Sequence, residues 1–413
     1  MHILKAVMFP LLAVGSALAL LLAMGKPWEK QFLKGGVIGA FFIKIAGCVL
    51  LYTLKPSLIR YSDARSFYLP QTLRLLSGEV PNRDFVSSYS FLFTPVLATP
   101  VKLWPSPGSI ALEMILVETA MLWIYIARCR REAWDGGWRV AFLYALSPFS
   151  CYWVAVSGHN GVLIAFWVML SLVLAERGRA ALAGIAAALA FLTAKVLALL
   201  AWPGLVLFDR EKRLARLLPL CVSLAAVASL SLAGVDSLGP LRGELRSSTH
   251  GNIWHIIGIV APAIRGVVSW PYLPILAFLV FFVPMCVLFL RAYDRRYRFD
   301  RGAAFVAATF LLFLALSRKG FSTYLIMGLP FVIHAIFRSG HPRTFPMLFL
   351  ILLEAIGFIE ESHGGDSFGV FLIDGARIVS YAALFVFCFT AAVRESAENA
   401  QPAFRQRDPQ ENS

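Results

Sequence analysis

Two carboxylates stand among arginines in the polar segment 55–88. Asp63 directly precedes a predicted helix over 64–76, and Asp84 follows Arg83. A carboxylate in such a position can accept a proton as a general base, which is the role we predict for Asp63. The simpler alternatives stay open, because Ser62 or Asp63 would also suit the helix N-cap. Asp84 could equally form a local ion pair or a turn.

The same segment carries more positive charge than its place in the chain explains. Its five basic and three acidic residues give a net charge of +2. Arginine presents a planar fork of donors that matches phosphate, so Arg60, Arg65 and Arg83 are predicted to bind a phosphate group. Contact with lipid headgroups is the alternative for each arginine.

Three later positions offer further polar groups. His159 and Asn160 stand in the turn SGHNG and could hydrogen-bond sugar hydroxyls or a phosphate. The alternative is a plain turn, which Gly and Asn favour. A metal at His159 is not predicted, because no partner residues with the spacing of metal ligands accompany it. Lys195 is an ionisable residue within an apolar run, which by default indicates function. Arg318 and Lys319, followed by Tyr324, form another phosphate-binding candidate, unless this end of the chain lies on the inner side.

The composition indicates what must position these residues. Of 413 residues, 59% are hydrophobic and 15% charged, and the mean hydropathy is +0.72. Soluble domains carry about 25% charged residues, so a disordered chain, a soluble enzyme and a nucleic-acid-binding domain are excluded. The chain is predicted to be an all-α polytopic membrane protein of about 11–13 transmembrane helices, and its net charge of +14 must be assigned by side of the membrane.

Basic clusters between the apolar runs set the predicted orientation. Clusters near residues 128–131, 177–179, 210–216, 291–301 and 338–343 are placed in the cytoplasm. Residues 1–393 then form one transmembrane domain, and 394–413 a disordered cytoplasmic tail. The first run is predicted to be a retained helix, with a cleaved signal peptide as the alternative. The predicted helices cover 6–24, 35–54, 110–127, 138–156, 161–175, 180–208, 214–234, 270–290, 302–316, 323–337, 344–360 and 372–393.

Two segments do not fit a simple up-and-down count of spans. The short, proline-containing segment 89–104 is predicted to be an interfacial or re-entrant helix, so that 55–104 forms an external loop with interfacial helices. The run 180–208 has basic clusters at both ends and must return to its own side, as two half-length helices that meet near 193–195. Lys195 would then lie deep in the protein or at the outer side.

Four stretches resemble one family in the expected order. SDARSFYLP with GEVPNRDF and a following Tyr…Thr-Pro helix, LSPFSCYWVAVSGHNGVL, LAGIAAALAFLTAKVLALLAWPGLVLF and SRKGFSTYLIMGLPFVI are similar to segments of GT-C superfamily glycosyltransferases, in particular the bacterial mannosyltransferase-like group. These are integral membrane enzymes that use polyprenyl-phosphate sugars. The chain departs from the family at Asn82, where a tyrosine is common, and after Asn160, where no acid follows.

The resemblance implies a catalytic aspartate at Asp63, with Asp84 in the second acidic position. It implies that Lys195, Arg318 and Lys319 hold the lipid phosphate, and it allows a divalent cation, although the sequence offers no clear ligand set. The expected function is inverting transfer of a hexose, with mannose favoured, to a glycan, lipid or protein acceptor at the outer face of the bacterial inner membrane. A transporter or flippase, an outer-face polysaccharide polymerase or ligase, and a non-catalytic scaffold are the alternatives.

Overall fold

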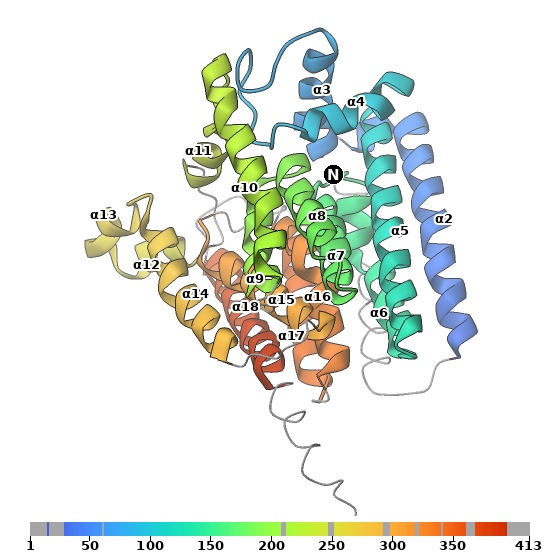
Figure 1. Cartoon of the computed structure of the whole chain (residues 1–413), viewed down its shortest axis with the longest axis vertical. Coiled ribbons are helices and arrows are strands. Elements are labelled where there is room, and N and C mark those ends of the chain that lie inside the picture. Colours follow the sequence, from blue (N-terminus) through green and yellow to red (C-terminus); the bar gives the residue numbers. More distant parts are fainter. Residues whose placement is uncertain are drawn as a thin grey trace, which may run out of the picture.

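The chain folds into a bundle of helices (Figure 1). The structure is a computed structural model that describes residues 15, 29–59, 62–207, 212–246, 252–291, 298–318, 322–339, 342–360 and 368–394. Its helices in chain order are α2 (Lys30–Leu54), η1 (Pro56–Leu58), η2 (Ala64–Tyr68), α3 (Leu69–Leu76), α4 (Phe93–Leu103), α5 (Pro107–Arg131), α6 (Gly136–Leu146), η3 (Ser150–Val154), α7 (Gly161–Glu176), α8 (Ala180–Thr193), η4 (Val196–Ala201), α9 (Pro203–Val206), α10 (Arg213–Ser229), η5 (Leu230–Ala233), α11 (Gly239–Arg246), α12 (Ile253–Val260), η6 (Pro262–Ile264), α13 (Arg265–Val268), α14 (Leu273–Arg291), α15 (Phe299–Leu316), η7 (Ser322–Tyr324), α16 (Leu325–Arg338), α17 (Thr344–Glu360) and α18 (Phe368–Arg394).

The helices have the length and composition of a membrane protein. Within the described residues, six helical segments are long and apolar enough to cross a membrane: α2, α5, α10 continued by η5, α14, α15 and α18. Shorter apolar helices, including α7, α8 and α16, fill the space between them. The prediction of a helical membrane protein is therefore confirmed at this level.

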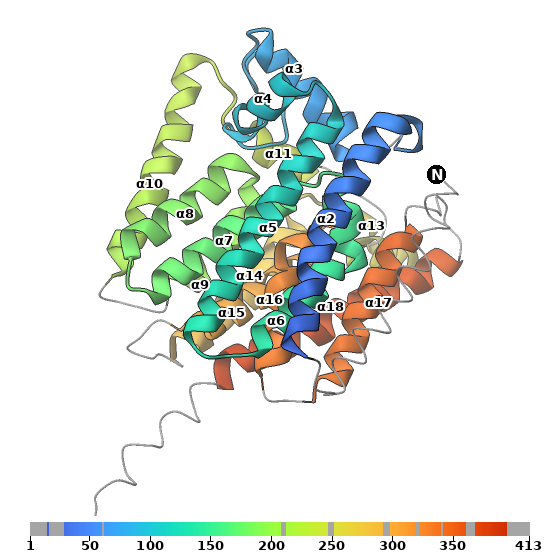
Figure 2. The same cartoon turned by 90° about the vertical axis from the view of Figure 1, so that its right-hand side faces the viewer.

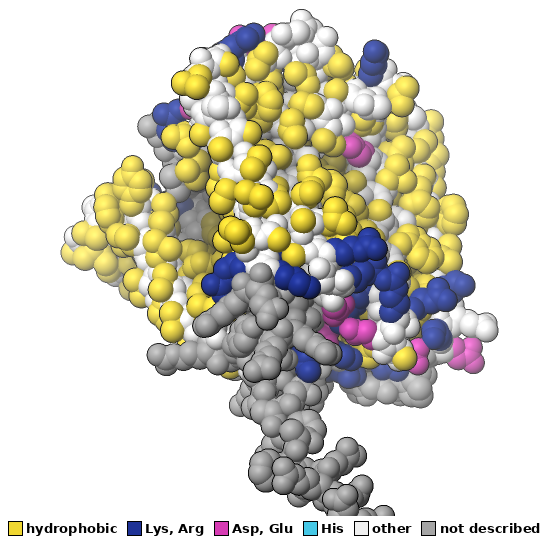
Figure 3. Space-filling model, viewed as in Figure 1, with side chains coloured by type: hydrophobic (Ala, Val, Ile, Leu, Met, Phe, Trp, Pro, Cys, Tyr) yellow, Lys and Arg dark blue, Asp and Glu magenta, His cyan; other side chains and the backbone are white. Residues whose placement is uncertain are grey.

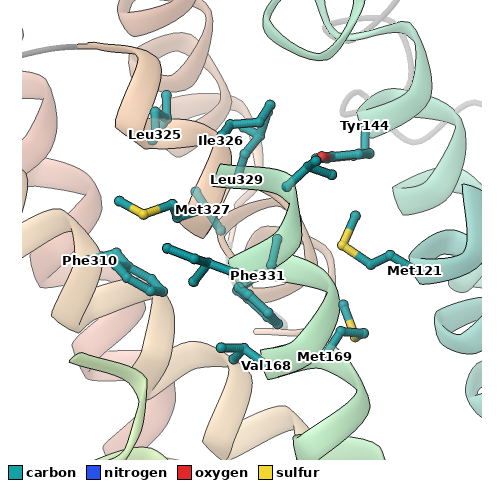
Figure 4. Packing of buried hydrophobic residues seen from close by; sticks show 14 of the residues in the cluster. Met121, Tyr144, Val168, Met169, Phe310, Leu325, Ile326, Met327, Leu329 and Phe331 are labelled. Atoms are coloured by element: carbon teal, nitrogen blue, oxygen red, sulfur yellow. The ribbon is translucent and has the colours of Figure 1, made fainter. Parts of the chain in front are cut away.

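The bundle has a central and a peripheral set of helices. Of the apolar window of α15, 83% is buried, against 11% for α10, whose large apolar side chains face outward. Figure 4 shows the centre, where Met121 of α5, Met169 of α7, Phe310 of α15 and Phe331 of α16 pack together. In two views at right angles, α2 and α5 run side by side at one edge of this core (Figures 1 and 2). Long exposed helices around a buried core are the arrangement expected in lipid.

The predicted helix over 138–156 is wrong in one respect. α6 ends at Leu146, and the chain restarts as the π-helical turn η3. Pro148 explains the break, because the residue before a proline is pushed out of helical geometry, and Ser147 has φ −54° and ψ 130°. After the break, η3 leads directly into the turn that carries the predicted site residue His159.

The predicted break in the run 180–208 is confirmed. α8 ends at Thr193, Lys195 is fully extended (φ −147°, ψ 157°), and η4 and α9 carry the chain back. The chain returns to the level at which α8 began, since a Cβ on Gly178, before α8, would lie 3.3 Å from Nζ of Lys212, after α9. Lys195 therefore stands at the tip of a helical hairpin.

The segment 89–104 contains a short helix, as predicted. α4 has 11 residues, about 17 Å at 1.5 Å per residue, which is too short to cross a bilayer. With η2 and α3 it covers one end of the bundle (Figure 1, top). This cover lies directly over the tip of the α8 hairpin. The backbone amide of Ser90 donates to the carbonyl of Ala194 (3.2 Å), and the amide of Leu92 donates to the carbonyl of Leu192 (3.0 Å).

The opposite end is basic and held by ion pairs. Arg128 of α5 contacts Glu176 of α7 (3.1 Å) and Asp300 of α15 (3.0 Å), and Arg338 of α16 contacts the same Asp300 (2.8 Å). In Figure 3, Lys and Arg side chains gather towards this lower end, below a broad hydrophobic zone. The structure thus brings the described parts of these predicted cytoplasmic clusters to one end, here called the basic end. The predicted first helix 6–24 and the predicted tail 394–413 lie outside the described residues, apart from Gly15 and Arg394, which ends α18.

Candidate functional site

The candidate site lies inside the bundle, where one short helix ends and two others begin. α7 begins at Gly161, α8 ends at Thr193 and α16 begins at Leu325. The 14 residues of α8 span about 21 Å, less than the roughly 30 Å hydrocarbon core of a bilayer. The polar groups at these helix ends are therefore set below the covered end of the bundle.

Asp63 enters this space from the cover. Its side chain is 31% exposed, and its Oδ2 accepts a hydrogen bond from the hydroxyl of Tyr68 (3.3 Å). Oδ2 also lies 3.5 Å from Nε2 of His159. The N-cap alternative falls to Ser62, whose Oγ accepts from the amide of Arg65 (3.2 Å), while the side chain of Asp63 makes no cap bond. The carboxylate is thus directed at the turn that holds His159.

His159 is buried in a tightly folded turn. Its backbone amide donates to the carbonyl of Trp153 (2.7 Å), and Gly158 takes φ +68°, a conformation that favours glycine. The amide of Gly161 donates to Nδ1 of His159 (3.0 Å). Since Nδ1 accepts, the ring proton of a neutral His159 is on Nε2, the atom that faces Asp63.

Asn160 is the most enclosed member of the turn. Its side chain is fully buried, and neither Nδ2 nor Oδ1 has a hydrogen-bond partner among the described residues. Its backbone amide donates to the hydroxyl of Tyr68 (3.3 Å), which links the turn to the cover a second time.

Lys195 supplies the positive charge of the site. It is 6% exposed, and its Nζ donates to the hydroxyl of Tyr324 (2.8 Å). The same Nζ lies 4.7 Å from the ring centroid of Tyr324 and 5.2 Å from that of Tyr89. Aromatic faces stabilise a desolvated cation, so the two tyrosines explain how an ammonium is held here.

Aromatic rings join the acidic and basic sides of the site. The rings of Tyr68 and Tyr89 meet edge to face at 5.0 Å, and both contact Phe93. Burial raises the pKa of Tyr68 well above its ordinary value, and the charge of Asp63 adds to the effect. Burial likewise raises the pKa of Tyr89, against the opposing influence of Lys195. Both tyrosines therefore stay neutral, and Tyr68 stays a donor to Asp63.

A second line of contacts connects the same two charges. The ring of His159 lies 5.8 Å from that of Tyr324, which accepts from Lys195. Asp63 and Lys195 are thus linked on one side through His159 and Tyr324, and on the other through Tyr68 and Tyr89. Sequence reasoning singled out His159, Tyr324 and Lys195, but it missed Tyr68 as a partner of Asp63. The signal was the tyrosine within SFYLP, five residues after the aspartate.

Other predicted residues are not brought to this site. Asp84 takes the local role, because its Oδ2 pairs with Arg83 (2.9 Å) and accepts from the amide of Val80 (2.7 Å). These contacts lower the pKa of Asp84. Arg65 donates to the backbone carbonyls of Pro56 (3.0 Å) and Ile59 (3.2 Å). These contacts support neither the catalytic role predicted for Asp84 nor the phosphate-binding role predicted for Arg65 and Arg83.

Arg318 also points elsewhere. Its guanidinium donates to the carbonyls of Val268 and Trp270, at the end of α13. These two hydrogen bonds give Arg318 a structural role, because they hold the loop before α14. Arg60 and Lys319 lie outside the described residues.

An apolar cavity of about 310 Å³ opens next to the tip of the α8 hairpin. It lies between α8, α10 and the turns near 82–91 and 235–241. Val196, the residue after Lys195, and Ser90, which binds the carbonyl of Ala194, both line it. Among the described residues, no group of three or more His, Cys, Asp or Glu side chains is arranged to hold a metal ion.

Comparison with known protein families, with curated proteins and with solved structures finds no match.

Proposed function

We propose that this protein is an integral membrane glycosyltransferase of the GT-C type. It moves a hexose, with mannose favoured, from a polyprenyl-phosphate donor to an acceptor hydroxyl of a glycan, lipid or protein. The reaction takes place at the covered end of the bundle, opposite the basic end, which is the outer face of a bacterial inner membrane if the basic end is cytoplasmic. The bundle then comprises about 11–13 spans.

The observation that carries this proposal is that Asp63 and Lys195 lie at one site, connected through His159 and four tyrosine or phenylalanine rings. A carboxylate that already accepts from Tyr68 and faces His159 can take a proton from a hydroxyl nucleophile. An ammonium held between Tyr89 and Tyr324 can stabilise a phosphate. The site has a fixed base and a fixed cation, which are the two groups that transfer from a phosphate-linked sugar requires.

The proposed step is a single displacement. The acceptor oxygen attacks the anomeric carbon as its proton passes to Asp63, and the bond between that carbon and the phosphate oxygen breaks. The electron pair of the broken bond leaves with the polyprenyl phosphate, whose added negative charge is neutralised by Lys195. Attack opposite the leaving group inverts the anomeric centre.

The apolar cavity supports a lipid-linked donor. It lies next to the tip of the α8 hairpin and is lined by apolar residues of α8, η4 and α10, including Leu192, Leu199 and Val227. A phosphate at Lys195 would place the first isoprene units of the donor in this cavity. A water-soluble nucleotide sugar offers no such chain, so the cavity favours the lipid donor.

Substitution of Asp63 tests the proposal. In membrane vesicles with a radiolabelled polyprenyl-phosphate mannose, Asp63→Asn should lower sugar transfer by about a hundredfold to ten-thousandfold, the usual contribution of a general base. Asp84→Asn is the matched control, because Asp84 is held in a local ion pair, and it should keep near-normal turnover. Normal transfer by a correctly inserted Asp63→Asn variant would eliminate Asp63 as the base.

Topology is tested separately. In a variant without the natural cysteines, a cysteine at Ser77 in the cover should react with a membrane-impermeant maleimide added to intact cells, whereas one at Arg131 at the basic end should not. The reverse labelling pattern would put the site on the cytoplasmic face.

A further inference from the structure

Three polar residues follow one face of α2. Lys44, Cys48 and Tyr52 are spaced by four residues, and all are buried, with exposed fractions of 5%, 1% and 6%. A spacing of four residues places side chains on one face of a helix. The apolar part of α2 is largely exposed, and this stripe lies on the face that packs against the bundle.

Two residues of the stripe, Lys44 and Tyr52, contact the segment that leads to the turn of His159. Nζ of Lys44 lies 2.7 Å from Oε2 of Glu118 in α5 and also contacts Oγ of Ser150, which itself bonds Glu118. The hydroxyl of Tyr52 donates to the carbonyl of Val156 (2.5 Å). Lys44 and Tyr52 thus bond the two ends of the segment from Ser150 to Val156.

That segment leads directly into the turn of His159. η3 begins at Ser150, and the amides of Ser157 and His159 donate to the carbonyls of Tyr152 (2.8 Å) and Trp153 (2.7 Å) within it. Because η3 follows the break at Pro148, no continuous helix with α6 supports it. Its orientation therefore depends on lateral contacts, and these include the bonds from Lys44, Glu118 and Tyr52.

We infer that Lys44, Glu118 and Tyr52 are positioning residues, which hold η3 so that Nε2 of His159 faces Asp63. The functional consequence rests on the proposed function, but the positioning itself does not. A displacement of about 1 Å at a reacting group can cost about a hundredfold in rate, so a loose turn should lower kcat more than it raises KM.

A buried ion pair allows positioning to be separated from stability. Removing one partner leaves an uncompensated charge and destabilises the whole fold, whereas replacing both with apolar residues is often neutral or stabilising. The informative variant is therefore Lys44→Met/Glu118→Met. It removes the groups that hold Ser150 without leaving a charge in the membrane.

The test is hydrogen–deuterium exchange of the full-length protein in detergent, together with sugar-transfer kinetics. In the double variant, and in Tyr52→Phe, exchange in a peptide covering 150–161 should rise about tenfold while a peptide covering 180–193 is unchanged, and the thermal midpoint should stay within a few degrees. kcat should fall about tenfold to a hundredfold with KM for the donor nearly constant.

Tyr125→Phe is the control. Tyr125 is also a buried tyrosine and bonds Nδ1 of His334 (2.8 Å), but it does so near the basic end. It should change neither the exchange of 150–161 nor kcat.

Unchanged exchange of 150–161 in the double variant would overturn the inference, and so would a rise spread evenly over the bundle. If the native protein transfers no sugar, the proposed glycosyltransferase function fails, but the exchange result still decides whether the stripe positions the turn.

Discussion

Nε2 of His159 lies 3.5 Å from Oδ2 of Asp63, and the amide of Gly161 donates to the other ring nitrogen. The imidazole is therefore oriented with its ring proton towards the carboxylate. An arrangement of this kind orients the carboxylate and stabilises the charge on it. In the proposed reaction, His159 therefore acts on the proton acceptor, and Asp63 acts on the substrate.

His159→Gln should lower kcat by about tenfold to a hundredfold, less than Asp63→Asn, because the amide can still donate to the carboxylate but is placed differently. Radiolabelled sugar transfer measures the effect. His334→Gln, at a fully buried histidine near the basic end, should leave kcat unchanged. Equal losses in the two variants would mean that a buried histidine is needed only for folding.

Lys195→Met should lower kcat/KM for the donor by about a hundredfold, since the cation that stabilises the leaving phosphate is lost. Lys195→Arg should recover part of the activity. Tyr324→Phe removes one hydrogen bond to Lys195 and should cost about fivefold to tenfold. Lys102→Met changes an exposed lysine of α4 and should have no effect; a similar loss there would point to general surface charge.

The cavity next to Lys195 predicts a dependence on donor chain length. Val227→Trp would fill part of the cavity, so KM for a long-chain donor should rise about tenfold, equivalent to roughly two buried methylene groups. A donor analogue whose phosphate carries a methyl group in place of the isoprene chain should be used as before. Leu232→Trp, at a residue that is 93% exposed, is the control. A uniform loss with both donors would place the chain elsewhere.

The close packing around Gly161, at the start of α7, predicts a steric clash for any side chain added there. A Cβ there would lie 2.3 Å from Cγ2 of Ile326 and 2.9 Å from Nδ1 of His159. Gly161→Ala should therefore lower the free energy of unfolding by about 1–3 kcal/mol and reduce kcat. Gly39→Ala in α2, where a Cβ would meet nothing within 4 Å, should not lower stability. Thermal unfolding in detergent and sugar transfer test both.

The raised pKa of Glu132, at the basic end, predicts that the stability of the fold depends on pH. Burial raises the pKa of Glu132 from 4.5 to about 7, although Arg128 opposes the shift. Between these values the folded state binds more protons than the unfolded state. The contribution of Glu132 is therefore present below about pH 4.5 and is lost as the pH rises through 7. Glu132→Gln should flatten the stability profile in this window, and an unchanged slope would contradict the assignment.

The sequence by itself determined the class of the protein and much of its local structure. Apolar runs of sufficient length, proline positions and basic clusters are local signals, and lipid restricts their meaning to helices. They predicted α17 over 344–360, the break at Lys195 between two basic clusters, and the short helix α4. The break at Pro148 carried a local signal as well, but the continuous apolar run outweighed it in the prediction.

Only the tertiary structure decided which polar groups meet. Asp63 and Asp84 look alike in sequence, as carboxylates beside arginines in one loop, yet Asp84 closes a local ion pair and Asp63 reaches His159. Lys195 and Arg318 were both candidate phosphate ligands, yet one faces Tyr324 and the other binds two carbonyls near α13. The reason is physical: hydropathy and helix periodicity depend on neighbours along the chain, whereas these contacts join residues from helices that pack together only in the folded bundle.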